Sequence, residues 1–458
     1  MKTCLRGAAA LAALAAFMGM SGAVQAADVE YSEPAYSWSG FYVGGYVGAG
    51  AAKARTELGA DFGEIGGFDA DLNGIGGDGF LGGALAGFNW QVSDRFVLGI
   101  QGDIGWTDIE ADLDADPLIN AKAGPDFIAN ASLRAGYLVT PDTLFYIIGG
   151  YSYAEFKLDG ELFEAVDFDA DQKYDGYHVG AGMETRLTDR LTARVEYRYT
   201  EFGSEDWDTD GFLDVKPTMH TGTLGLAYNL FPTAGEGEVA TPTADVVEPQ
   251  VSWTGFYVGA NAGAGGTVDK LTLDVGGDDP SFDGIGGEGF LGSLMAGYNW
   301  QVSDSIVLGL QGDIGIADLK SKLDASAEFL GLEAELDAET KLEWFANASL
   351  RAGYLATPET MLYVIGGYSY AHVKQEAELT VGIPQGLIID EDISEKQDLD
   401  GFHIGAGAEA MLTDSLTLRA EYRYTQYGKE DFFGIDGIES KLATHTGTVG
   451  IAWLFNGL

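Results

Sequence analysis

The chain carries the same sequence unit twice, one copy after the other. The nine residues Asn-Ala-Ser-Leu-Arg-Ala-Gly-Tyr-Leu at 130–138 return unchanged at 347–355. The spacing of matching residues is 210 at Trp90 and 225 at Glu196, and it changes only across acidic, irregular stretches. A constant framework with connections of varying length predicts one domain duplicated in tandem.

Alternating apolar and polar residues predict eight β-strands per copy. Their connections alternate between long stretches and turns of four residues, such as Val-Ser-Asp-Arg at 92–95. Long extracellular loops and short periplasmic turns are typical of outer-membrane barrels, with both ends of each copy in the periplasm. The predicted strands of the first copy are 40–50, 81–91, 96–107, 127–138, 143–156, 175–186, 191–202 and 218–230, and the predicted long loops are 51–80, 108–126, 157–174 and 203–217.

The same alternation indicates which side chains face lipid. In the seventh predicted strand, Val195 and Tyr197 alternate with Arg194, Glu196 and Arg198. A charge facing lipid near the bilayer midplane costs roughly 2–4 kcal/mol, so we place the charges inside. This predicted interior set comprises Asp103, Arg134, Glu184, Arg194, Glu196 and Arg198 in the first copy, and Asp313, Arg351, Glu409, Arg419, Glu421 and Arg423 in the second.

An eight-stranded barrel is just wide enough inside for its own side chains. We therefore expect the interior charges to pair and to plug each barrel. The alternative is a gate that opens when the pairs exchange partners. A wider, single sixteen-stranded barrel would act as a porin-like channel for small solutes. The long segment between the copies and the separate first-strand motif of each copy favour two barrels.

The N-terminus predicts export. Lys2 and Arg6 precede an apolar stretch, and Val-Gln-Ala at 24–26 predicts signal-peptide cleavage between Ala26 and Ala27. The single cysteine, Cys4, would leave with this peptide, which excludes disulfides and thiolate metal sites from the mature chain. The predicted organisation is a signal peptide (1–26), a periplasmic segment (27–37), a first barrel (38–231), a periplasmic linker (232–252) and a second barrel (253–458).

The formal net charge of −46 excludes nucleic acid as a partner, because phosphates would be repelled. Acidic loops are expected to hold divalent cations only loosely. The run that begins Asp-Ala-Asp-Leu-Asn-Gly at 69–74 resembles the start of a calcium loop but has Phe80 where the bidentate glutamate belongs. We expect no specific metal site and no cofactor.

Three motifs carry a family resemblance: Trp-x-Gly-Phe-Tyr-Val-Gly at 38–44, Glu-Tyr-Arg-Tyr-Thr at 196–200 and His-Thr-Gly-Thr at 220–223, each repeated in the second copy. In this order they resemble the small OmpA-like surface barrels of alphaproteobacteria, a group that includes major surface antigens and haemin-binding members. The resemblance implies an all-β fold, here two tandem eight-stranded antiparallel transmembrane up-and-down barrels. It also implies a structural or surface role, contact with outer-membrane lipid and lipopolysaccharide, and insertion by the barrel-insertion machinery. The family usually has one barrel.

The histidines are the remaining candidates for chemistry. His178 and His403 correspond between the copies and lie on the inward parity near the outer rim, whereas His220 and His445 lie on the opposite parity. Imidazoles at a rim can ligate haem iron, so His178 and His403 are candidate haemin ligands. A hydrogen-bonding role for these two histidines is the simpler interpretation. No inward serine–histidine pair appears at matching positions in both copies, so we expect no enzyme and no catalytic residues. A surface protein that binds haemin or another protein through its loops is a further alternative.

Overall fold

A computed structural model of the chain describes residues 37–61, 67–115, 119–162, 166–206, 213–231, 252–273, 280–329, 332–383, 387–431 and 437–456. These residues form 18 antiparallel strands and no helix. Among them, no helix is long and apolar enough to cross a membrane. The predicted signal peptide, most of the periplasmic segment and nearly all of the linker fall outside the described residues.

The strands of the first copy pair in chain order. β1 is paired along one edge with β2 and along the other with β10, so the ladder that starts at β1 returns to it. β4 continues the line of β3 along β5, and β9 continues the line of β8 along β10. The strands are β1 (Gly40–Asp61), β2 (Gly67–Gln91), β3 (Phe96–Thr107), β4 (Ala111–Ala115), β5 (Ile119–Thr140), β6 (Thr143–Leu162), β7 (Val166–Arg186), β8 (Leu191–Phe202), β9 (Glu205–Asp206) and β10 (Leu213–Asn229).

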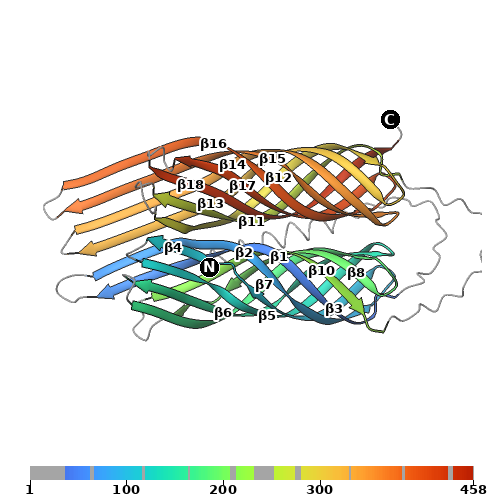
Figure 1. Cartoon of the computed structure of the whole chain (residues 1–458), viewed down its shortest axis with the longest axis horizontal. Helices are drawn as coiled ribbons and strands as arrows, with labels where there is room; N and C mark the ends of the chain where they lie inside the picture. Colours follow the sequence, from blue (N-terminus) through green and yellow to red (C-terminus); the bar gives the residue numbers. More distant parts are fainter. Residues whose placement is uncertain are drawn as a thin grey trace, which may run out of the picture.

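The second copy repeats this order. β11 is paired with β12 along one edge and with β18 along the other. Figure 1 shows the two copies as elongated strand bodies lying side by side, with the longest hairpins at one end. The strands are β11 (Gly255–Leu273), β12 (Ser281–Gln301), β13 (Ile306–Phe329), β14 (Leu332–Thr357), β15 (Thr360–Ile383), β16 (Leu387–Met411), β17 (Leu416–Asp431) and β18 (Ile438–Asn456).

The prediction of long irregular loops is wrong in its boundaries. Much of the predicted loop at 157–174 is a regular antiparallel ladder in which Lys157 is paired with Asp171. The strands continue because backbone hydrogen bonding does not depend on which side chains are polar. Beyond a membrane both faces of a strand can be hydrophilic, so the period-2 pattern used to find strands disappears there while the ladder goes on.

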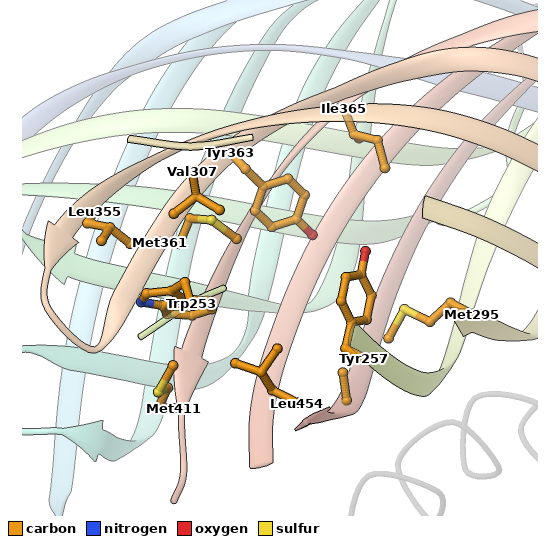
Figure 2. Close-up of a cluster of buried hydrophobic side chains, with 11 residues drawn as sticks. Trp253, Tyr257, Met295, Val307, Leu355, Met361, Tyr363, Ile365, Met411 and Leu454 are labelled. Carbon is orange, nitrogen blue, oxygen red and sulfur yellow. The ribbon is translucent and has the colours of Figure 1, made fainter. Parts of the chain in front are cut away.

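The inner face of each copy is apolar at the end where the short turns lie. In the second copy, Trp253 is fully buried, and its indole nitrogen donates a hydrogen bond to the Pro358 carbonyl of a short turn at 3.0 Å. Figure 2 shows this side chain among methionine, leucine and tyrosine side chains from several strands. Trp38 makes the matching bond to the Pro141 carbonyl at 3.1 Å. The tryptophan of the repeated first-strand motif therefore helps to fill the interior next to the turns.

Candidate functional site

The side chains of the predicted interior charge set are buried or nearly buried, and within each copy they contact one another. They come from four strands in each copy, β3, β5, β7 and β8 in the first and β13, β14, β16 and β17 in the second. Alternate residues of a strand point to the same face, which is why Arg194, Glu196 and Arg198 line up along β8. Each copy contributes three arginines and three carboxylates, so each charge set is formally neutral.

Glu184 is the centre of the first group of contacts. Its carboxylate accepts hydrogen bonds from Arg134 Nη2 at 2.6 Å and from Thr192 Oγ1 at 2.7 Å, and Arg194 Nη2 lies 3.9 Å away. The Arg134 guanidinium also lies over the Tyr146 ring, 3.9 Å from its centroid. A cation over an aromatic face gains attraction from the ring quadrupole. The arginine is thus held by a carboxylate and a ring in place of water.

Arg198 joins the other two carboxylates of the first charge set, Asp103 and Glu196. It donates two hydrogen bonds to Asp103, at 3.0 and 3.1 Å, and a third from Nε to Glu196 at 2.5 Å. The second oxygen of Glu196 accepts a hydrogen bond from the Tyr146 hydroxyl at 2.6 Å. Tyr146 therefore touches both groups and links them.

Gln101 connects the two groups a second time. Its carbonyl oxygen accepts from Arg194 Nη1 at 2.8 Å and from the Tyr42 hydroxyl at 3.1 Å, and its amide donates to Asp103 at 3.2 Å. The prediction missed Gln101, Tyr42 and Tyr146 as members of the site. The alternation of residues along their strands indicates that they face inward, but the prediction considered only charged side chains.

The second copy reproduces the arrangement. Glu409 accepts from Arg351 at 2.6 Å and from Arg419 at 2.7 Å, and Arg423 lies within 3.3 Å of Asp313. Arg423 also donates to Glu421 at 2.7 Å. Corresponding residues of the two copies therefore form corresponding ion pairs.

Two small cavities lie beside the charges. One cavity of about 40 Å³ is lined by Arg194, Glu196 and Arg198, and another of about 40 Å³ is lined by Asp313 and Arg423 among others. Cavities of this size hold a few water molecules.

The two candidate haemin ligands are buried inside the same interiors. His178 Nε2 lies 2.9 Å from Ser132 Oγ, and its Nδ1 lies 2.8 Å from Ser152 Oγ. His403 contacts the corresponding residues, Ser349 and Ser369, at 2.9 and 2.8 Å. The prediction that no inward serine–histidine pair occurs at matching positions in both copies is therefore wrong, because strand parity does not record which residues meet across the interior. A haem iron would have to displace a serine from one ring nitrogen in each case.

One acidic residue of the predicted loops, Asp112, lies on β4, one of the strand segments that extend into these predicted loops. Asp112 is paired with Lys122 at 3.2 Å. In the described residues no group of three or more acidic or histidine side chains has the geometry of a metal site. The run at 69–74 belongs to β2, and the side chains of its first five residues lie outside the described set.

Comparison with known proteins adds a family to this geometry. The family model described as the outer membrane protein beta-barrel domain matches residues 10–229 and again residues 238–455. The chain belongs to this outer-membrane β-barrel family. The family domain is present twice, as the repeat predicts.

Several relatives within this family are described as outer-membrane proteins. The 31 kDa outer-membrane immunogenic protein of Brucella melitensis is 38% identical over 226 residues, which are 48% of this chain and 90% of that protein. The 22 kDa outer membrane protein of Rhizobium leguminosarum is 32% identical over 180 residues, 39% of this chain and 71% of that protein. These similarities confirm the resemblance to alphaproteobacterial surface barrels and support an outer-membrane location.

Solved structures also resemble the chain. The toluene transporter TodX of Pseudomonas putida is 11% identical, with 93% of this chain and 92% of that chain covered and a TM-score of 0.29.

Proposed function

We propose that this protein is a non-enzymatic structural protein of the outer-membrane surface, built from two closed eight-stranded barrels with plugged interiors. The observation that carries the proposal is the formally neutral, hydrogen-bonded charge network found inside both copies. A solute path through either interior would have to separate ion pairs that are shielded from water. Breaking such pairs is costly.

The strand pairing supports two barrels over one of sixteen strands. A sixteen-stranded barrel needs β1 beside β18 and β10 beside β11 along their lengths, whereas here β1 is paired with β10 from Tyr42 to Leu58. The lengths of the relatives support the same conclusion. About half of this chain matches 90% of the Brucella melitensis relative, so one copy corresponds to nearly a whole protein.

The outer faces of the strands suit a bilayer. Leu133 is 69% exposed and its counterpart Leu350 is 66% exposed, and both project away from the charge network on β5 and β14. An exposed apolar band around a strand body is the surface that lipid covers. We include membrane lipid and lipopolysaccharide among the partners, with divalent cations loosely held by the acidic strand extensions beyond the band.

Paired cysteines test the closure of the first barrel in a chain whose only natural cysteine is Cys4. Val43 and Tyr228 are ladder partners on the exposed face, and Trp453 is the second-copy counterpart of Tyr228. A short thiol-specific cross-linker should join Val43→Cys to Tyr228→Cys and should not join Val43→Cys to Trp453→Cys. The reverse result would establish a single large barrel and overturn the proposal.

Conductance tests the plugged interior. The purified full chain in a planar lipid bilayer should give no large, stable channels. Stable channels of porin size in a chain that has passed the cysteine test would refute the structural role while leaving the two barrels intact.

A further inference from the structure

Several polar side chains lie on the parity that should face lipid, yet the structure buries them. His220 and His445 are 4% and 1% exposed. His220 bonds Tyr197 of its own copy at 2.6 Å, but its other nitrogen lies 3.4 Å from Glu288 of the other copy. These residues therefore lie where the two strand bodies touch, side by side in Figure 1.

The contact between the copies has two-fold character. In a two-fold interface, residues on the axis meet their own counterparts. Thr143 Oγ1 lies 2.7 Å from Oγ1 of Thr360, its counterpart 217 residues later. Ile75 is ladder-paired with Ile285, its counterpart 210 residues later. Because one such pair lies beside a short turn and the other in the outer part of β2 and β12, the axis runs along the barrels and both copies point the same way.

Away from the axis, each copy inserts a tyrosine into a gap on the other. A Cβ atom on Gly222 would lie 2.1 Å from the Tyr422 ring, and one on Gly447 would lie 2.2 Å from the Tyr197 ring. Tyr422 also donates a hydrogen bond to the Ala49 carbonyl of the first copy at 2.9 Å. Only glycine leaves room for these rings, so the two glycines act as matched holes.

The outer part of the contact is charged, with acids facing histidines and lysines across the copies. Glu288 of the second copy lies 3.4 Å from His220 and 3.7 Å from Lys53. Asp78, the counterpart of Glu288, lies 3.4 Å from His445 and 3.2 Å from Lys270. Each copy thus presents one acidic side chain to a histidine and a lysine of the other copy.

The part nearer the short turns is apolar and closely packed. Met183 and Val195 of the first copy form one buried cluster with Ala408, Ala410 and Ala420 of the second. Small residues allow close approach of two backbones, which is how surfaces associate in lipid, where apolar burial alone gives no advantage.

We propose that these residues form a lipid-excluding seam that locks the two barrels into one pseudo-two-fold unit in the membrane. The inference rests on the two-barrel arrangement proposed above. The partner of each seam surface is the other copy of the same chain. Both copies carry the tyrosine, the glycine hole, the histidine and the acid, so each surface is complementary to itself and fixes one orientation.

A cysteine pair on the axis tests the docking in the full chain. Thr143→Cys with Thr360→Cys should form a disulfide on mild oxidation, because the two hydroxyl oxygens lie 2.7 Å apart. After cleavage at a protease site inserted in the 232–250 segment, the halves should stay joined until reductant is added. The matched control is Gly102→Cys with Gly312→Cys, two open positions at which the nearest atom to an added Cβ is 3.8 Å away. It should give no link.

A second experiment needs no cysteine. After the same cleavage, the two halves should migrate together in a native gel, and Gly222→Leu with Gly447→Leu should separate them by filling both holes. Gly102→Leu with Gly312→Leu should leave the complex intact. Heat-modifiable migration of each half shows that the variant barrels still fold.

The results separate the two proposals. Failure of the Val43–Tyr228 link removes the two-barrel arrangement and the seam with it. If that link forms while the Thr143–Thr360 disulfide does not, and the unaltered halves part on cleavage, the barrels stand and the seam is refuted.

Discussion

Removing the charge of Glu184 is the sharpest perturbation of the interior. In Glu184→Gln the side chain keeps its size, but Arg134 and Arg194 lose the carboxylate that they share. Arg134 keeps its hydrogen bond to Tyr42 and the ring of Tyr146. The interior then carries one uncompensated positive charge.

The contacts give the size of the effect. Removing one partner of a buried ion pair typically costs about 3–5 kcal/mol. The retained tyrosine ring contributes up to about 2 kcal/mol to holding the cation. We therefore expect Glu184→Gln to lower the free energy of unfolding of the first copy by about 3 kcal/mol, the lower end of that range.

The assay is a urea titration of the full chain folded in lipid vesicles. Cleavage at the inserted linker site after each step allows the folded band of each half to be scored separately in unheated gels. The second half is the internal control, and its midpoint should not move. Glu409→Gln should produce the mirror result, with a shift in the second half only.

A double variant makes the reasoning refutable. Arg134→Met with Glu184→Met removes one positive and one negative charge and leaves the interior neutral, and apolar replacement of a buried pair is often harmless. The double variant should therefore be more stable than Glu184→Gln. A single-variant loss below about 1 kcal/mol, or a double variant less stable than the single one, would show that charge pairing does not hold the interior together.

Three further results are expected. His178→Gln should leave any absorbance change on haemin titration unaltered, because both ring nitrogens already have serine partners; loss of the change would identify a ligand. Gly87→Ala should destabilise the fold by about 1–3 kcal/mol in a urea titration through overpacking, since a Cβ there would lie 2.4 Å from the Tyr42 hydroxyl, whereas Gly102→Ala should be near neutral. Amides of 157–162 should exchange slowly with deuterium, as ladder residues do, and fast exchange would support the loop first predicted.

The prediction of the interior charge set rests mainly on strand parity, the alternation of side chains between the two faces of a strand. The alternation on β8 was sufficient to send Arg194, Glu196 and Arg198 to one face, and the repeat located the other copy's equivalents. Parity says nothing about which charges meet. The pairing of Arg134 with Glu184 crosses the interior between β5 and β7, which are not ladder partners, so it depends on barrel curvature and shear that a single strand does not record.

Strand parity could not predict the seam between the two copies, for a different reason. Strand alternation places His220 and Tyr197 on the outward face, and outward residues of a membrane barrel are expected to face lipid. A polar residue on that face was the available signal that something other than lipid covers it. Gly222 gave no signal, because the strands are rich in glycine and the need for this one arises only from the Tyr422 ring of the other copy.

In each copy the first and last strands are hydrogen-bonded to each other, and this affects how such proteins can be enlarged by duplication. Leu230, just after β10, donates its backbone hydrogen to the Phe41 carbonyl at the start of β1, and Gly255 is paired with Asn456 in the second copy. A copy therefore returns the chain to the end at which it entered. Further copies can be appended by lengthening the polypeptide on one side alone, with no inversion of the next copy and no segment to thread across. The gene segment for such a unit can therefore be duplicated repeatedly, and the seam then determines whether neighbouring copies associate or stay apart.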